Sequence, residues 1–305
     1  MVVPAKERPI KTVSAKQRKM RNNLIAYSFI APNFIGFAVL TLVPILSAVV
    51  LSFANWNGTT QIQWVGLGNY AKLFGDRIFK QSFLNTIIYS VATVPLTIVA
   101  SLALAVLLNR KLFARNFFRT VSFFPYVASM VAVAAVWNAL FDPNKGMINE
   151  TLSALGVQNP PRWIADPHWA MVDLILFSVW KMMGYYMIIY LAGLQGINPE
   201  LYEAASLDGA NGWQRFRFVT LPQLSSTTFF VLMMVIIQCF KVYDIVYMIT
   251  QGGPGTATYV LVYDIYQVAF RDLRYGYASA ISMVLFVLVL AITIVQFRVE
   301  KRRQN

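Results

Sequence analysis

The sequence predicts an all-α protein that crosses a membrane six times. Of its 305 residues, 57% are hydrophobic and only 13% are charged, whereas soluble domains carry about a quarter charged residues. Six segments each hold about twenty apolar residues, the length that a helix needs to cross a bilayer. Inside lipid, such a segment can satisfy its backbone hydrogen bonds only as a helix. The segments are 27–53, 83–108, 120–141, 169–191, 227–249 and 277–297.

The first segment follows a basic arm and is too long for the apolar core of a cleaved signal peptide. We therefore expect it to remain as a span. Pro32 and Pro44 predict kinks in this span, and Pro125 predicts a kink in the third. The predicted organisation is a basic cytoplasmic arm (1–26), a transmembrane domain (27–297) and a basic cytoplasmic tail (298–305).

The net charge of +13 indicates membrane orientation. Under the positive-inside rule, the distribution of basic residues places both termini in the cytoplasm. Attraction to anionic membrane lipid accounts for the excess charge, so we expect no nucleic-acid partner. The cytoplasmic set comprises Lys6, Arg8, Lys11, Lys16, Arg18, Lys19, Arg21, Arg110, Lys111, Arg115, Arg119, Arg215, Arg217, Arg298, Lys301, Arg302 and Arg303. The smaller outer set comprises Lys72, Arg77, Lys80, Lys145, Arg162, Arg271 and Arg274.

Residues typical of catalytic sites are nearly absent. His168 is the only histidine and Cys239 the only cysteine, which excludes a disulfide within the chain and argues against a metal site. We expect Cys239 to be a small core residue. No glycine-rich GxxxxGK[ST] loop occurs, so we expect neither ATP nor another cofactor on this chain. The composition thus argues against an enzyme.

A polar loop, residues 198–222, separates the fourth and fifth apolar segments. Asn198 can cap a helix that begins at Pro199. Either Gly209 or Gly212 can end this helix in the left-handed conformation. The sequence therefore predicts a short capped helix, suited to seating in a groove of a partner protein. An ordinary amphipathic helix lying on the membrane surface is the alternative.

The same loop carries a spaced motif. It reads EAA, three residues, glycine, nine residues, an aliphatic residue, one residue and Leu-Pro. This pattern resembles the signature cytoplasmic loop of the permease subunits of bacterial ABC importers. The resemblance assigns the coupling of this chain to an ATPase to Glu203, Ala204, Ala205, Gly209, Leu221 and Pro222.

Further motifs resemble those of carbohydrate-uptake permeases of the maltose-permease type, and they occur in the order found in that family. Together they extend the resemblance over nearly the whole chain, from Leu24 to Arg298. The motifs are Val65–Tyr70, Leu73-Phe74, Asn85-Thr86, Ala192–Ile197, Phe240–Asp244 and Thr250–Pro254.

The resemblance implies a type I ABC importer permease in the inner, or cytoplasmic, cell membrane. Such a subunit forms half of a translocation pathway for a sugar or oligosaccharide. Its implied partners are a second homologous permease, two copies of a cytoplasmic ABC ATPase that bind ATP and Mg, and an extracytoplasmic solute-binding protein. The predicted helix in the loop is then the coupling helix.

Polar and aromatic residues inside the spans are candidates for the substrate pathway. Lys241 and Asp244 are three residues apart in the fifth segment, so on one helix they would share a face and pair. Gln238, one turn earlier, extends this face. In the fourth segment, Tyr185 and Tyr186 offer rings that suit the apolar face of a sugar. A structural ion pair and ordinary packing are the alternatives for these residues.

Two other transport functions remain open. A glycerol-phosphate or polyol permease would share the same motifs but would favour basic side chains in the pathway. A self-sufficient ion-coupled carrier would require inverted repeats with interrupted helices. No such internal duplication is visible in the sequence.

Overall fold

The computed structural model describes residues 15–59, 61–110 and 112–304. Internal contacts divide the chain into two units, Met1–Val50 and Leu51–Asn305. Of the predicted basic arm, residues 1–14 lie outside the described residues, and the remainder is already helical.

The N-terminal unit is a long apolar helix with a wider turn in its middle. It comprises α1 (Ala15–Phe37), the π-helical η1 (Ala38–Leu42) and α2 (Val43–Leu51). In η1 the backbone N–H of Val43 donates to the carbonyl of Ala38, one residue farther back than in an α-helix. Pro44 follows directly, and its ring would collide with the preceding turn of a regular helix. The wider turn thus accommodates Pro44, whereas Pro32 lies inside α1.

The second unit is a helical bundle whose long helices are joined by shorter elements. Its long helices are α4 (Arg77–Leu108), α5 (Arg115–Val127), α6 (Met130–Leu140), α8 (Ala170–Gln195), α12 (Ser225–Phe240) and α15 (Tyr275–Gln304). The shorter elements are α3 (Gly68–Gly75), α7 (Met147–Ala154), η2 (Trp163–Ala165), α9 (Pro199–Leu207), α10 (Gly212–Arg215), η3 (Phe216–Thr220), α11 (Leu221–Gln223), α13 (Asp244–Ile249), α14 (Leu261–Tyr266) and η4 (Gln267–Arg271). Strands β1 (Ala54–Asn55) and β2 (Gln63–Trp64) pair antiparallel, with Ala54 opposite Trp64.

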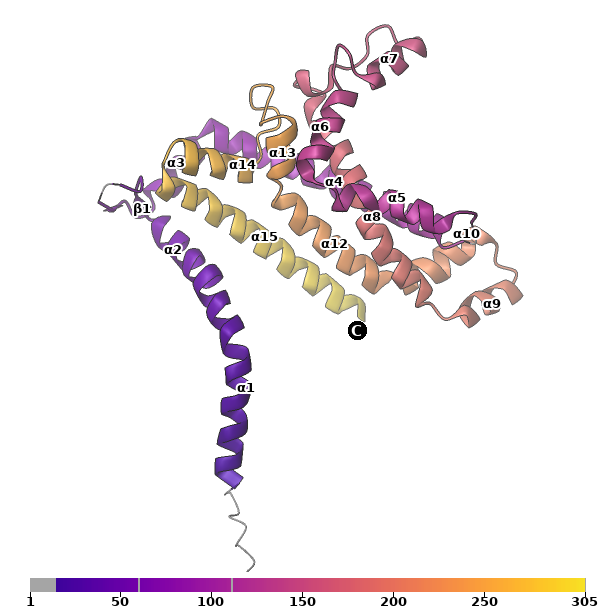
Figure 1. The fold of residues 1–305 in the computed structure, drawn as a ribbon, viewed down its shortest axis with the longest axis horizontal. Helices are drawn as coiled ribbons and strands as arrows, with labels where there is room; N and C mark the ends of the chain where they lie inside the picture. Colours follow the sequence, from indigo (N-terminus) through magenta and orange to yellow (C-terminus); the bar gives the residue numbers. More distant parts are fainter. Residues whose placement is uncertain (1–14, 60, 111, 305) are drawn as a thin grey trace, which may run out of the picture. The chain divides into compact units, whose positions relative to one another are not determined.

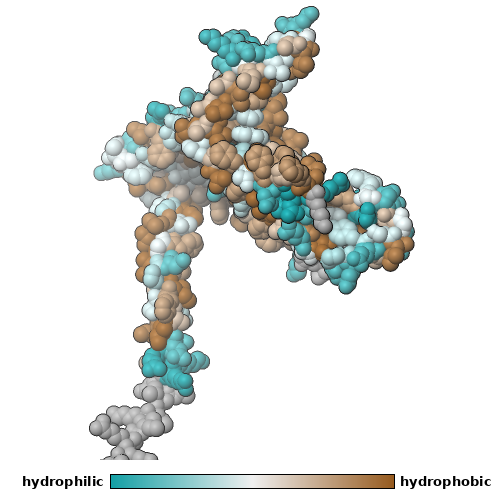
Figure 2. All heavy atoms as spheres, turned by 45° about the vertical axis from the view of Figure 1, so that its right-hand side comes forward, coloured by the Kyte–Doolittle hydropathy of each residue, from teal (hydrophilic) through white to brown (hydrophobic). Residues whose placement is uncertain are grey.

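In the described part of the chain, four helical segments are long and apolar enough to cross a membrane. The number rises to six if each of two bent helix pairs forms one span. Hydrophobic residues cover the middle of the second unit, and hydrophilic residues gather at its α9 and α7 ends (Figure 2). This distribution is that of a bundle whose sides face lipid or other apolar surfaces.

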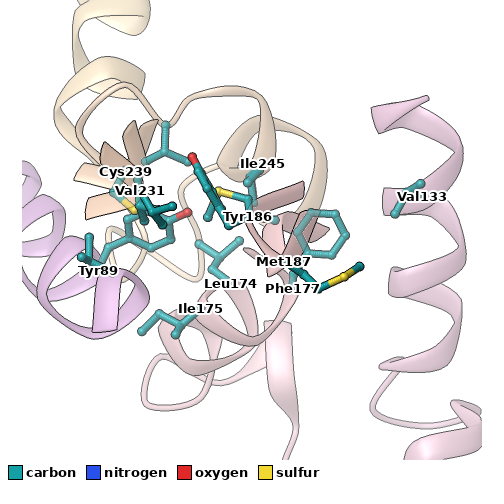
Figure 3. Close-up of a cluster of buried hydrophobic side chains, with 14 of the residues drawn as sticks. Tyr89, Val133, Leu174, Ile175, Phe177, Tyr186, Met187, Val231, Cys239 and Ile245 are labelled. Atoms are coloured by element: carbon teal, nitrogen blue, oxygen red, sulfur yellow. The ribbon is translucent and has the colours of Figure 1, made fainter. Parts of the chain in front are cut away.

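Helix α4 forms the centre of the bundle, packing most extensively along α8 and also against α12 (Figure 1). The core between these helices contains Tyr89 of α4, Phe177 and Tyr186 of α8, and Cys239 of α12 (Figure 3). The hydroxyl of Tyr89 donates to Ser178 Oγ at 2.7 Å, which satisfies a polar group at the centre of this apolar cluster. Cys239 is 1% exposed, which confirms its prediction as a core residue.

The third predicted span is broken rather than kinked. Helices α5 and α6 meet at an angle of 102°. The break lies at Ala128, whose ψ of 149° is extended, whereas Pro125 remains inside α5. The prediction of one helix kinked at Pro125 was therefore wrong. The proline weakens the last turn of α5, but the chain leaves the helix three residues later.

The fifth predicted span also differs from its prediction. Helix α12 ends at Phe240, and residues 241–243 connect it to the short helix α13. At its other end, α12 follows α10–α11 across a bend of 68°. The expected continuous helix over residues 227–249 is thus replaced by a helix, a non-helical connection and a second short helix.

A partly buried hydrogen-bond network ties the segment before α14 to the N-terminal part of α4. Asn85 Nδ2 donates to the carbonyls of Thr256 and Tyr259, at 2.9 Å each. Thr86 Oγ1 accepts from the backbone N–H of Leu261, also at 2.9 Å. The Asn85-Thr86 motif therefore holds a segment that lies more than 170 residues away in the sequence, just after the Thr250–Pro254 motif.

Asp264 of α14 lies beside this network and is 3% exposed. Its Oδ2 accepts a hydrogen bond from Ser82 Oγ at 3.2 Å. Burial penalises the charged form and raises the pKa of Asp264 to about 6. The carboxyl group therefore costs folding energy at neutral pH, when it must be ionised inside the protein.

Candidate functional sites

Helix α9, in the polar loop between α8 and α12, begins with the predicted cap. The side chain of Asn198 accepts a hydrogen bond from the backbone N–H of Glu200 at 3.1 Å, and Pro199 occupies the first helical position. Proline fits there because the N–H that it lacks would have no partner within the helix. The start of α9 is thus determined by adjacent residues and needs no contact from the bundle.

The end of α9 is likewise formed by neighbouring residues. Gly209 adopts a φ of +78°, its N–H donates to the carbonyl of Ser206 at 3.1 Å, and the N–H of Ala210 donates to the carbonyl of Ala205 at 2.9 Å. These two bonds form a Schellman motif, which satisfies carbonyls at the helix end. Of the two predicted glycines, Gly209 ends the helix, whereas Gly212 begins α10.

One face of α9 is free, and the other is tied to the segment that follows. Leu201 and Leu207 are 40% and 90% exposed, and with the exposed Ala204 between them they form a small apolar surface on one side. On the opposite side the hydroxyl groups of Tyr202 and Thr220 share a hydrogen bond of 3.0 Å. No residue of α9 is buried in the bundle.

The segment after α9 contains a π-helical turn just before a proline, as the segment before Pro44 does. The π-helical η3 ends one residue before Leu221, whose N–H donates to the carbonyl of Phe216. Pro222 follows, as Pro44 follows η1, so each wide turn precedes a proline by the same spacing. A capping box between Asn211 and Gln214 starts this segment. The Leu-Pro pair of the motif therefore ends a stiff helical piece that leads into α12.

Within the membrane segments, Tyr185 has an aromatic partner that the sequence did not assign. Its ring stacks on Tyr126 of α5, with ring centroids 4.4 Å apart and an interplanar angle of 13°. Both rings are only partly buried. Tyr186, in contrast, is 1% exposed and meets Tyr185 edge-on at 5.1 Å. In this structure Tyr186 is therefore a core residue that supports Tyr185.

Lys181 of α8 forms hydrogen bonds to the backbone at the break between α5 and α6. Its Nζ donates to the carbonyl of Pro125 at 2.9 Å and lies 3.5 Å from the carbonyl of Ala128. These carbonyls belong to the last turn of α5 and have no partner in α6, because the helix ends there. The ammonium group thus stabilises a break that would otherwise leave polar groups unsatisfied in an apolar setting.

The predicted pairing of Lys241 with Asp244 was wrong. Lys241 caps the end of α12 and Asp244 starts α13, so the two residues do not share a helix face. Among the described residues, no salt bridge joins Lys241 to Asp244, whereas Asp272 does pair with Arg274.

Gln238, Lys241 and Asp244 are all exposed, although they stand next to buried residues of the core. Exposed polar side chains at the end of a membrane helix face water or a polar cavity more readily than lipid. Their assignment to a substrate pathway stays a prediction. No group of three or more metal-ligating side chains occurs in the described ranges.

Comparison with protein families matches residues 97–305 to the family described as binding-protein-dependent transport system inner membrane component. The chain belongs to this family. The matched range includes the EAA residues of α9 and the Leu-Pro pair of α11, and the predicted family is confirmed.

Relatives of this permease match it over nearly their full length. The lactose transport system permease protein LacF of Rhizobium radiobacter is 36% identical over 298 residues, covering 96% of this chain and 99% of that protein. The trehalose/maltose transport system permease protein MalF of Thermococcus litoralis is 33% identical, covering 94% and 97%. The sn-glycerol-3-phosphate transport system permease protein UgpA of Agrobacterium fabrum is 33% identical, covering 92% and 96%. These relatives are transport permeases.

Among solved structures, a bacterial ABC transporter involved in the import of the acidic polysaccharide alginate has a similar fold. The TM-score is 0.83 at 24% identity, and the match covers 93% of this permease and 98% of that chain. The predicted fold, a helical membrane permease of the ABC importer type, is therefore confirmed.

Proposed function

We propose that this permease forms half of the translocation pathway for a sugar or oligosaccharide and is driven by a separate ATPase through α9. The observation that carries the proposal is the construction of α9. It is capped at both ends by its own neighbours, tied to η3 on one side and exposed on the other. A rigid helix with a free face is what a partner needs to move the attached spans.

The sugar assignment is supported by two kinds of observation. The names of relatives include lactose and trehalose/maltose transport. In this chain, Tyr126 and Tyr185 form a stacked, partly exposed pair, and exposed polar groups of Gln238, Lys241 and Asp244 are available in the same bundle. Flat rings suit the apolar face of a sugar ring, and polar side chains suit its hydroxyl groups.

The proposed assembly contains a second homologous permease, two copies of a cytoplasmic ATPase and an extracytoplasmic solute-binding protein. ATP and Mg are bound by the ATPase, and no cofactor is bound by this chain. Both termini lie in the cytoplasm, on the same side as α9. The family description supports dependence on a binding protein and a place in the inner membrane.

Reconstituted vesicles test the role of α9. Glu203→Lys reverses a charge on α9, and Gly209→Pro disrupts its end, so each variant should abolish sugar-stimulated ATP hydrolysis while leaving membrane insertion intact. Glu150→Lys, the same change on an exposed outer helix, serves as the control and should behave as wild type. Crosslinkers at Ala204 and Ser206 should capture the ATPase in cells. Normal stimulation in both α9 variants would refute the coupling role.

A glycerol phosphate or a polyol is the second candidate substrate, favoured by the relative named for sn-glycerol-3-phosphate transport. Lys181 is already engaged by backbone carbonyls, which leaves the exposed Lys241 as the basic group available to a phosphate. Competition by glycerol phosphate for uptake, lost in Lys241→Gln, would identify the phosphate ester as the substrate. Inhibition by neutral disaccharides alone would identify a sugar.

A further inference from the structure

A cavity of about 910 Å³ lies at the α9 end of the second unit, between the end of α4 and the segment α10–η3. This volume is within the range of about 300–1,000 Å³ that is typical of ligand pockets. Of the residues assigned to coupling or to the substrate pathway, only Leu221 lines this cavity, so neither role accounts for it. Its apolar wall is formed mainly by Val99, Leu102, Ala103, Val106, Leu194 and Leu221.

Two arginines also line this cavity. They are Arg110, just after the end of α4, and Arg215, at the end of α10. Arg215 Nη1 donates to Ser206 Oγ at 3.1 Å, and in the described part of the chain neither guanidinium forms an ion pair. No carboxylate is among the lining residues. Guanidinium groups match phosphate oxygens in geometry as well as in charge.

A tryptophan completes the arrangement. Trp213 also lines the cavity, is 70% exposed, and lies 5.6 Å from Phe216 between ring centroids. Tryptophan is typical of the boundary between hydrocarbon and head groups. The cavity thus combines an aliphatic wall with basic groups and an indole where α4 ends. A phospholipid has matching parts, because it joins an apolar acyl chain to a charged head group.

We propose that this cavity binds an anionic phospholipid of the cytoplasmic leaflet, with an acyl chain against the α4 wall and its phosphate between Arg110 and Arg215. Two positive charges, neither of them in a salt bridge among the described residues, favour an anionic lipid over a zwitterionic one. A sugar fits poorly, because the wall offers few groups that could bond its hydroxyls. The inference rests on the membrane location of the chain and not on the identity of its substrate.

Such a lipid would contact both a membrane span and the segment that holds α9. Arg215 reaches Ser206 of α9, and Thr220, another lining residue, bonds to Tyr202 of α9. Occupancy of the cavity would therefore stabilise the position of the coupling helix. Activity of the assembled transporter would consequently depend on the anionic lipid content of the membrane.

The test uses the full chain in vesicles that contain phosphatidylglycerol with a photoreactive group in its acyl chain. Crosslinks should fall on peptides from 99–110 and 212–221. The double variant Arg110→Gln, Arg215→Gln should reduce the yield by about tenfold or more, since each basic group near an anionic surface contributes about 1 kcal/mol. Ala103→Trp, which fills the apolar wall, should reduce it as well while both arginines remain.

Arg217→Gln is the matched control, because Arg217 is exposed on the same segment but does not line the cavity. It should retain the wild-type yield. An equal yield with photoreactive phosphatidylcholine, or an unchanged yield in the double arginine variant, would overturn the proposal. So would capture of a protein instead of a lipid by a crosslinker at Ala103. Each result can be read whether or not the α9 variants lose stimulated ATP hydrolysis.

Discussion

Two polar segments of the second unit are made rigid in different ways. Helix α9 is closed by residues within a few positions of its own ends, chiefly Asn198 and Gly209, and none of its residues is buried. The segment before α14 depends on Asn85 and Thr86, which are more than 170 positions away in the sequence. The first segment is rigid by local capping and the second by tertiary hydrogen bonds.

This difference is consistent with the coupling role proposed for α9. A helix that must present a free face to a partner cannot be held by burial, so its order has to come from its caps. A connection that only joins two membrane helices can be buried, and burial makes its hydrogen bonds expensive to lose. Changes in the α14 region should therefore lower the stability of the whole bundle, whereas changes in α9 should alter local order and coupling.

The largest expected effect is that of Asn85→Leu. It removes both donors to the carbonyls of Thr256 and Tyr259, which are two partly buried hydrogen bonds worth about 1–2 kcal/mol each. Thermal unfolding of the purified chain should show a clearly lower Tm. Gln81→Leu, which removes only the bond from Gln81 to Asn85, is the control and should have a smaller effect. Equal losses in both would show that the loop is not held by Asn85.

Asp264→Asn should remove a pH dependence from stability. The pKa of Asp264 is raised to about 6 in the folded protein, from 3.8 in the unfolded chain. The contribution of this group to the free energy of unfolding is therefore most favourable below pH 3.8 and is lost as the pH rises through 6. The variant should therefore gain stability at pH 7.5, by up to about 3 kcal/mol, and little at pH 4. Urea unfolding at both values measures this. An equal change in stability at both pH values would show that the effect does not arise from ionisation of Asp264.

Gly209→Ala tests the local cap of α9. The added Cβ meets no atom within 4 Å, so the cost arises from the positive φ alone and should be about 1–2 kcal/mol. Hydrogen exchange should become faster in residues 204–210, with the Tm of the bundle unchanged. Gly212→Ala also meets open space but lacks a positive φ, and it should leave exchange as in wild type. A lowered Tm in Gly209→Ala would contradict the local origin of this rigidity.

The smallest expected effect is that of Tyr202→Phe, which removes one partly buried hydrogen bond between α9 and η3. A loss of about 1 kcal/mol is expected, confined to α9. Hydrogen exchange should quicken in α9 and remain unchanged near Asn85. The opposite pattern would indicate that α9 is coupled to the hydrogen-bond network around Asn85.

Much of this comparison was predictable from the sequence, because the features concerned are local. Asn198, Pro199 and Gly209 are the residue types that begin and end a helix, and the structure places them as predicted. Long apolar stretches identified α4, α8 and α15 for the same reason. The spacing of the EAA and Leu-Pro motifs is also a local feature, and it indicates the family.

Other features were not predictable, since they depend on groups from different parts of the chain. Nothing near Pro125 in sequence indicates that Lys181 would satisfy the carbonyls of a broken helix. The break after Phe240 likewise separated Lys241 from Asp244, which a continuous helix would have paired.

From the amino-acid sequence it follows that the chain is a membrane permease with long apolar helices and that α9 is capped. Hydrophobic length and capping are properties of neighbouring residues, which act before any tertiary contact forms. Only the tertiary structure decided where spans break, which polar groups meet and where the arginine-lined cavity lies. Each of these depends on a donor or wall supplied by a distant helix, and the energy of an unsatisfied polar group in an apolar setting selects the arrangement that supplies it.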